Sequence, residues 1–283
     1  MHEITVNSQF LGLKDINVHV EDSRGTGRPV ILIHGWPLSG KSWKNQISAL
    51  SNAGFRVITY DRRGFGESDK PAMGYNYDTF AEDLSGLITE LDLKDISLVG
   101  FSMGGGEVAR YICNYGEELI KSVVFASSVT PMMLKSTDNP DGPLDEIKAE
   151  KMSADLTTDQ NSFYDQFTKN FFSANADGNI LITEAERMEA LALCKQADLH
   201  AAQEAMQSFA NTDFREDILK VTVPTLVIHG DSDAIVPFEG SGARTHKAIT
   251  HSELCVITGG PHGINASHAE EFNAALITFL NKS

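Results

Sequence analysis

The chain has 283 residues, of which 41% are apolar, and its formal net charge at pH 7 is −16. This length fits one large domain or a domain with an inserted subdomain. The acidic balance argues against nucleic acid and anionic membranes as partners, and it disfavours a strongly anionic substrate. The sequence contains no uncharged apolar run of about 18 residues, so we expect no membrane span. It also shows no basic segment followed by an apolar one, so we expect no signal peptide.

The cysteines are odd in number and widely spaced, at Cys113, Cys194 and Cys255. This pattern predicts reduced thiols rather than disulfides or a metal site, so we expect a cytoplasmic protein. None of the three has the neighbours of a nucleophile. We expect no cofactor and no bound metal.

Predicted strands and helices alternate through the first part of the chain. Alternating polarity predicts an edge hairpin from 3–7 and 16–21. Helical spacing begins at about Ser42 and again over 78–91, where Asp78 is the expected N-cap. A continuous apolar run, typical of a strand buried on both faces, occurs at 29–33, and further strands are predicted at 55–60, at 95–98, which is only partly apolar, and at 120–126.

The alternation stops between about Pro131 and Arg215, where no strand-like run is present. Aromatic residues one turn apart predict a helix over 159–172, a capping box at 183–186 opens a second helix, and a third surrounds Met206. This insertion has fifteen Asp and Glu and seven Lys and Arg, and so carries half of the net charge. We predict an all-helical cap from 131 to 215, with a core formed by 1–130 and 216–283.

Strands are predicted again at 223–228 and 254–257, with helices at about 241–248 and 268–280. Buried strands that alternate with helices give an α/β fold, in which a mainly parallel central sheet is flanked by helices. Ligands bind such sheets at the carboxyl ends of the strands. Every candidate catalytic and oxyanion-binding residue named below follows the end of a predicted strand.

A serine nucleophile is predicted by Gly100-x-Ser102-x-Gly104, which lies between a buried strand and a helical segment. Small residues on both sides let a strand turn sharply into a helix, so that the hydroxyl stands at the positive end of that helix. The backbone N–H of Met103 then faces the oxyanion. Trp36 is well placed to supply a second N–H from the loop after the 29–33 strand, whereas Pro37 has no N–H to donate.

The base that activates this serine is predicted to be His262, in the Gly-Gly-Pro-His-Gly loop after the last strand. We expect structural roles for His34 and His229 and a surface or capping role for His268. For the acid that orients the base, the loop after residue 228 offers Asp231 and Asp233. Spacing alone leaves both carboxylates open.

Taken together, the motifs resemble those of the α/β-hydrolases, and more narrowly those of the cofactor-free (non-haem) haloperoxidase and arylesterase–perhydrolase group. The resemblance is weakest over about 140–199. It implies that the acid is Asp233. It agrees with oxyanion donors at Trp36 and Met103. From the aromatic rings of the insertion we expect a substrate pocket over Ser102, lined by Trp36, Pro37, Phe101, Phe163 and Phe167. The matching segments are 34–40, 60–66, 100–107, 229–233 and 261–263.

The resemblance implies a serine hydrolase for small carboxylic esters, with perhydrolase activity when hydrogen peroxide replaces water. Pro37 resembles the residue of the peroxide-using members. The small ester or acid, with peroxide, is the expected partner, and a homo-oligomer is compatible with the sequence. Two alternatives remain: a lactone or γ-lactam hydrolase with the same triad, and a small-molecule receptor. Residues 173–184 also imitate a calcium loop, although Ser173 lacks the carboxylate of its first position, which favours an ordinary turn before a capped helix.

Overall fold

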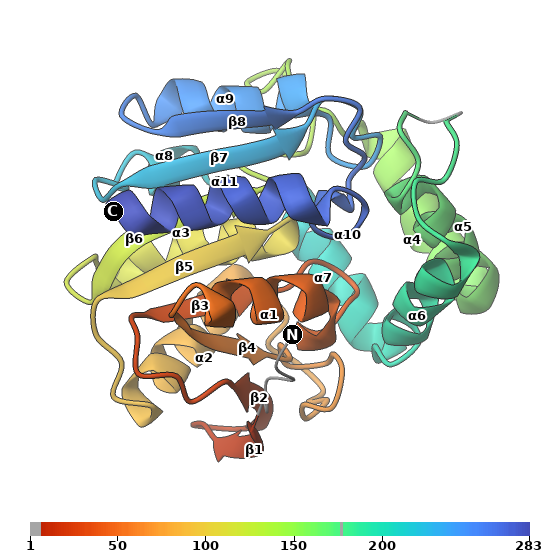
Figure 1. Cartoon of the computed structure of the whole chain (residues 1–283). Helices are drawn as coiled ribbons and strands as arrows, with labels where there is room; N and C mark the ends of the chain where they lie inside the picture. Colours follow the sequence, from red (N-terminus) through yellow and green to blue (C-terminus); the bar gives the residue numbers. More distant parts are fainter. Residues whose placement is uncertain (1–6, 176–177) are drawn as a thin grey trace.

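A computed structural model describes residues 7–175 and 178–283 (Figure 1). Its centre is an eight-stranded sheet in the order β1-β2-β4-β3-β5-β6-β7-β8. The pairs β1–β2 and β2–β4 are antiparallel, and every later pair is parallel. The strands are β1 (Asn7–Gly12), β2 (Asn17–Asp22), β3 (Pro29–Ile33), β4 (Arg56–Tyr60), β5 (Ile96–Phe101), β6 (Ile120–Ala126), β7 (Thr225–Gly230) and β8 (Glu253–Ile257).

The central strands are the apolar runs of the sequence. Every residue of β5 and of β7 is buried, as expected for strands that are covered by helices on both faces. The edge hairpin differs from its prediction, because the first strand is Asn7–Gly12 rather than 3–7. It pairs with β2 from Asn7 opposite Asp22 to Gly12 opposite Asn17. Residues 3–6 of the predicted strand lie outside the described residues.

Helices cover both faces of the sheet (Figure 1). Helices α1 and α11 contact each other on one face, and α2 and α3 contact each other on the other. The helices of this core are η1 (Gly40–Trp43), α1 (Lys44–Asn52), α2 (Tyr77–Glu90), α3 (Met103–Tyr115), α8 (Arg215–Ile218), η2 (Phe238–Gly240), α9 (Gly242–Ala248), α10 (Ile264–Ser267) and α11 (Ala269–Lys282).

Helix α2 begins at Tyr77, and its N-cap is Asn76 rather than the predicted Asp78. The Asn76 side chain accepts a hydrogen bond from the Thr79 amide at 3.0 Å. Asp78 instead lies in the first turn, where its carboxylate accepts a hydrogen bond from Arg110 at 2.7 Å. Both asparagine and aspartate cap well, so the choice depends on which one has the extended backbone that precedes a helix.

Four helices between β6 and α8 form the segment on the right of Figure 1: α4 (Glu146–Thr158), α5 (Gln160–Phe171), α6 (Glu184–Cys194) and α7 (Leu199–Asn211). The capping box of α6 forms as predicted, with Thr183 and Glu186 bonded reciprocally. The sequence did not predict α4. Only Leu156 of this helix is fully buried, so its periodicity is weak, although Asp145 caps it by accepting from the Lys148 amide at 2.7 Å.

No helix in the described part of the chain has both the length and the apolar character that crossing a bilayer requires.

Candidate active site

Ser102 occupies the sharp turn between β5 and α3. Its backbone has φ 55° and ψ −118°, a conformation that L-residues rarely adopt. Glycine is needed on both sides of the turn. A Cβ on Gly100 would lie 2.4 Å from the Gly104 carbonyl oxygen, and a Cβ on Gly104 would lie 2.5 Å from the Ile33 carbonyl oxygen. The Gly-x-Ser-x-Gly pattern therefore holds the Ser102 hydroxyl at the end of the sheet.

His262 lies between the other two residues of the expected triad. Its Nε2 is 2.9 Å from Ser102 Oγ, and its Nδ1 is 2.7 Å from Asp233 Oδ2. All three side chains are buried. With Nδ1–H donating to the carboxylate, the Nε2 lone pair faces the serine hydroxyl, which is the arrangement a general base requires.

The two candidate carboxylates differ sharply in their surroundings. Asp233 Oδ1 accepts hydrogen bonds from the amides of Ile235 at 2.9 Å and Val236 at 2.8 Å. Asp231 is exposed, and its carboxylate accepts instead from the Gly259 amide at 2.7 Å, which ties together the loops after β7 and β8. Of the two carboxylates, only Asp233 contacts the histidine.

Asp233 also contacts a second histidine. His229 Nε2 lies 3.2 Å from Asp233 Oδ2 and 2.8 Å from the Val236 carbonyl oxygen. Burial alone would raise the pKa of Asp233, but the attraction of His262 and the hydrogen bonds from His229 and His262 hold it well below its usual range. These contacts favour the ionised carboxylate that a triad requires. From the sequence we expected only a structural role for His229. The position of His229 four residues before Asp233 is the feature of the sequence that could have indicated this contact.

The two amides expected to face the oxyanion lie beside Ser102. Met103 is the first residue of α3, so its N–H has no carbonyl partner within the helix. Trp36 follows Gly35, where a Cβ would lie 3.1 Å from the Ser102 Cβ. The Trp36 indole Nε1 donates to the Ala202 carbonyl at 2.9 Å, which attaches this loop to α7.

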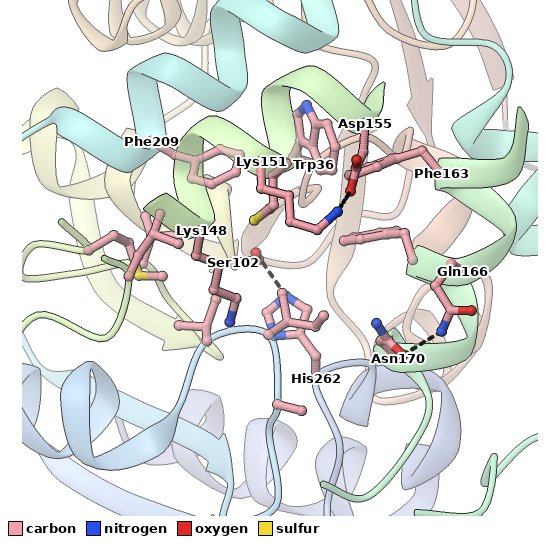
Figure 2. Close-up of a pocket in the computed structure, with 18 of the residues that line it drawn as sticks. Trp36, Ser102, Lys148, Lys151, Asp155, Phe163, Gln166, Asn170, Phe209 and His262 are labelled. Atoms are coloured by element: carbon pink, nitrogen blue, oxygen red, sulfur yellow. Dashed lines mark hydrogen bonds and ion pairs between the residues drawn. The ribbon is translucent and has the colours of Figure 1, made fainter. Parts of the chain in front are cut away.

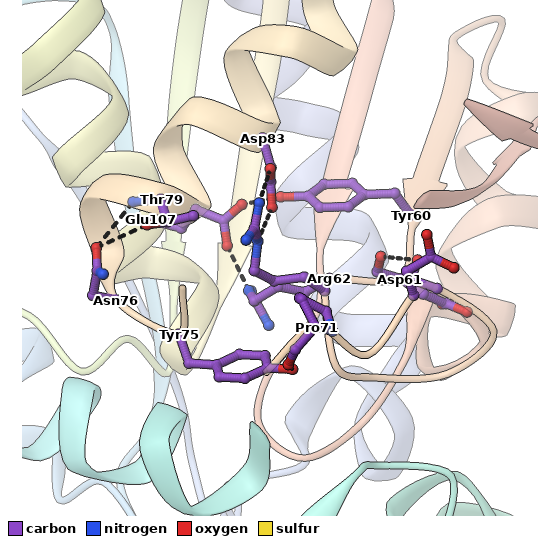
Figure 3. Close-up of polar contacts among 12 residues, drawn as sticks. Tyr60, Asp61, Arg62, Pro71, Tyr75, Asn76, Thr79, Asp83 and Glu107 are labelled. Atoms are coloured by element: carbon purple, nitrogen blue, oxygen red, sulfur yellow. Dashed lines mark hydrogen bonds and ion pairs between the residues drawn. The ribbon is translucent and has the colours of Figure 1, made fainter. Parts of the chain in front are cut away.

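A buried polar network around Arg62, Glu107 and Tyr60 (Figure 3) is bonded to His34, two residues before Trp36. The Arg62 amide donates to His34 Nε2 at 2.9 Å, and the Arg62 guanidinium donates to the His34 carbonyl at 3.0 Å. Glu107 accepts from Arg62 Nε at 2.7 Å and from the Tyr60 hydroxyl. Burial, with the charge of Arg62, lowers the pKa of His34 to about 3, so this imidazole is neutral and its role is structural.

Ser102 and His262 open into a cavity of about 600 Å³ below α4 and α5 (Figure 2). Trp36, Phe163 and Phe167, three of the expected pocket residues, line it. Phe101 does not, because it is buried beside His262 with ring centroids 5.1 Å apart. Pro37 is also buried and does not line the cavity. The rest of the lining comes from Val129, Met133, Leu144, Lys148, Lys151, Met152, Asp155, Thr158, Asp159, Ser162, Gln166, Asn170, Phe209, Ala234, Ile235 and Val236.

The calcium-like segment lies only partly within the described residues, since Ala176 and Asp177 fall outside them. Ser173 and Asn175, by contrast, are described: the Asn175 amide donates to the Ser232 carbonyl at 2.8 Å, and the Ser173 hydroxyl donates to the Lys169 carbonyl at 2.7 Å. Within the described ranges, no three His, Cys, Asp or Glu side chains gather as metal ligands.

Comparisons with known proteins agree with this geometry. A family model described as alpha/beta hydrolase fold matches residues 28–269. A non-heme chloroperoxidase of Kitasatospora aureofaciens is 42% identical over 91% of this chain and 94% of its own, and a bifunctional esterase/perhydrolase of Acinetobacter calcoaceticus is 32% identical over 96% and 99%. The crystal structure of a bromoperoxidase from Bacillus anthracis is 50% identical, with a TM-score of 0.93 over 98% of this chain and 100% of that one.

Proposed function

Because this chain belongs to the α/β-hydrolase family, in the group of non-haem haloperoxidases and esterase/perhydrolases, we propose that it hydrolyses small carboxylic esters and transfers the same acyl groups to hydrogen peroxide. The observation that carries this proposal is the alignment of Ser102, His262 and Asp233 at one end of the cavity, with hydrogen-bond distances of 2.9 and 2.7 Å.

In the first half of the reaction, Ser102 Oγ attacks the ester carbonyl while its proton moves to His262 Nε2. Asp233 keeps the imidazole in the required tautomer and stabilises its positive form. The N–H groups of Met103 and Trp36 are aimed at the negative oxygen of the tetrahedral intermediate. The intermediate collapses as the alcohol leaves with the proton of His262, and the acyl group remains on Ser102.

In the second half, the incoming nucleophile decides the product. His262 takes a proton from water or from hydrogen peroxide, whose oxygen attacks the acyl carbonyl. The second tetrahedral intermediate then releases Ser102, which regains its proton from His262. Water gives a carboxylic acid, whereas hydrogen peroxide gives a peracid. Reversal of the hydrolytic second half, in which Ser102 attacks a free acid and water leaves with the proton of His262, supplies the same acyl-enzyme, so a carboxylic acid with peroxide is a second entry to perhydrolysis.

The lining of the cavity supports small substrates, and the cysteines elsewhere in the chain support a reducing compartment. The cavity is lined largely by apolar side chains such as Phe163, Phe167 and Met133, which suits short acyl chains. Cys113, Cys194 and Cys255 are all free thiols, which favours the cytoplasm as the place of action. Pro37, next to the proposed oxyanion donor, is the residue we expect to favour peroxide over water.

The test is a paired assay on the purified protein. One arm follows hydrolysis of p-nitrophenyl acetate, and the other follows bromination of a dimedone-type acceptor with acetate, peroxide and bromide. We expect both activities in the native chain, and their joint loss by more than about 10⁴-fold in Ser102→Ala. Ser85→Ala, on the outer helix α2, is the matched control and keeps both.

Bromination that survives in Ser102→Ala would contradict a shared acyl-enzyme. Ester hydrolysis without any bromination in the native chain would remove the perhydrolase half of the proposal.

A further inference from the structure

Helix α4 supplies the charged side of the cavity. Lys148, Met152, Asp155 and Asp159 are spaced four, three and four residues apart, so they lie along one face, and all four line the cavity. Lys151 lines it as well. Lys148 therefore lies on the face of α4 that lines the cavity, one turn before the partly buried Met152.

The acidic side chains that line the cavity beside Lys148, Asp155 and Asp159, already have partners, and so does Asp145 at the start of α4. Asp155 forms an ion pair with Lys151 at 2.6 Å. Asp159 caps α5 by accepting from the Ser162 amide at 3.0 Å, and Asp145 caps α4 by accepting from the Lys148 amide. Among the residues that the structure describes, Lys148 is thus the cavity-lining cation that has no carboxylate partner. Figure 2 shows its ammonium directed into the pocket and away from the Lys151–Asp155 pair.

We infer that Lys148 binds a free carboxylate on the substrate, so that the preferred esters are monoesters of small dicarboxylic acids. This inference rests on the proposed function and names the substrate class of the same site. The ester end lies at Ser102, the methylene chain contacts the apolar lining, and the second carboxylate meets the Lys148 ammonium. A charge-assisted contact of this kind selects one acyl chain by charge, which the apolar lining cannot do.

The overall charge of −16 does not prevent this selection. At physiological ionic strength, exposed charges farther apart than about 8 Å are largely screened. The charges that face the cavity from α4 and from the start of α5 are Lys148, Lys151, Asp155 and Asp159. Asp155 is paired with Lys151. Asp159 lies eleven residues after Lys148, about 16 Å along a helix and beyond the screening length. Of these four groups, Lys148 therefore carries the charge that no neighbour among them cancels.

The experiment compares the monomethyl and dimethyl esters of succinic, glutaric and adipic acid. Each monomethyl ester has one free carboxylate, and each dimethyl ester has none. In Lys148→Gln we expect kcat/KM for the best monomethyl ester to fall about three- to fivefold through a higher KM, the size expected for a solvent-exposed ion pair. Lys148→Glu should lose about tenfold, and Lys148→Arg should retain the native value. The dimethyl esters should be unaffected in all three variants.

Lys121→Gln is the matched control, because Lys121 is an exposed lysine at the start of β6, the end of the sheet opposite to Ser102. Added salt should lower kcat/KM for the monomethyl ester in the native chain and in Lys121→Gln, and should have little effect in Lys148→Gln. A monomethyl-to-dimethyl ratio that is equal in the native chain and in Lys148→Gln would overturn the inference and leave the esterase proposal standing. Inactivity of the native chain toward all of these esters, monomethyl and dimethyl alike, would overturn the esterase proposal itself.

Discussion

At the scale of single residues, the carboxylate of Asp233 is the most constrained group in the site. It is buried, and it is surrounded by donors from His262, His229 and the amides of Ile235 and Val236. Such a carboxylate cannot rotate away from the histidine without leaving buried donors unpaired. We therefore expect the orientation of His262 to depend on Asp233 more than on any other single side chain.

The first prediction separates the two carboxylates of this loop. Asp233→Asn should lower kcat for p-nitrophenyl acetate by about 10⁴-fold, because an amide supports the wrong tautomer of the histidine. Asp231→Asn removes charge from an exposed turn and should change kcat less than threefold, within the range of a surface substitution. The reverse order of the two effects would exchange their roles.

At the scale of elements, the end of α5 joins the cap to the loops of the triad. The Phe171 carbonyl accepts from the Gly263 amide at 2.9 Å, and the Phe171 ring lies edge-on to the His262 ring with centroids 4.9 Å apart. Ala174 forms a β-bridge with Asp233. The segment 171–174 thus contacts both the loop of the base and the loop of the acid, so the cap and the proposed catalytic residues form one packed unit.

The second prediction uses this contact. Phe171→Leu should lower kcat about tenfold with little change in KM, because the edge of the ring that supports His262 is lost and small misplacements of a base are costly. Phe163→Leu is the matched substitution. Phe163 lines the cavity in the same helix but does not contact His262, so it should alter KM instead. Thermal unfolding of both variants checks that each one folds, and a change confined to KM in both would contradict the coupling.

Helix α4 illustrates how tertiary contacts decide the function of an element. Ile147 is largely exposed and Leu156 is fully buried, so the sequence of this helix has little amphipathic periodicity. Asp145, which caps α4, is the feature of the sequence that could have predicted this helix. The charges of Lys148 and Lys151 acquire a role only because α4 lies along the cavity, and a pattern confined to this segment cannot reveal what the segment packs against.

At the scale of the whole molecule, buried ionisable groups make folding depend on pH. His34 is fully buried, and burial together with the charge of Arg62 lowers its pKa to about 3, whereas the unfolded chain has the ordinary value of 6.5. Between these two values the unfolded chain binds a proton that the folded chain does not. Stability from this group therefore rises with pH and is lost as the pH falls from 6.5 toward 3.

The third prediction measures that slope. The free energy of unfolding in urea is determined at pH 7, 6, 5 and 4.5, choices that fall within about two units of the ordinary histidine pKa. In His34→Asn the curve should fall less steeply below pH 6.5 than in the native chain, even though the variant is less stable at pH 7. Since the other titrating groups are common to both proteins, parallel curves would show that His34 does not carry this dependence.

The sequence by itself determined the mainly parallel sheet, the helical character of the segment between β6 and α8, and the positions of Ser102 and His262 after their strands. These features depend on local chemistry. Continuous apolar runs form buried strands, and glycine is required at Gly100 because a Cβ there would lie 2.4 Å from the carbonyl oxygen of Gly104, four residues later. Such requirements act between neighbours in the chain, so they leave a mark in the spacing of residues.

Only the tertiary structure decided which groups meet across loops. It placed Asp233 rather than Asp231 against His262, brought His229 to the same carboxylate, kept Phe101 out of the cavity, and turned Lys148 into it. His262 and Ser102 are 160 positions apart in the chain, and their hydrogen bond exists because the carboxyl ends of the parallel strands β5 and β8 lie at the same edge of the sheet. Contacts of this kind depend on packing in three dimensions. Two residues of one loop, such as Asp231 and Asp233, can therefore differ in burial and in the groups they contact.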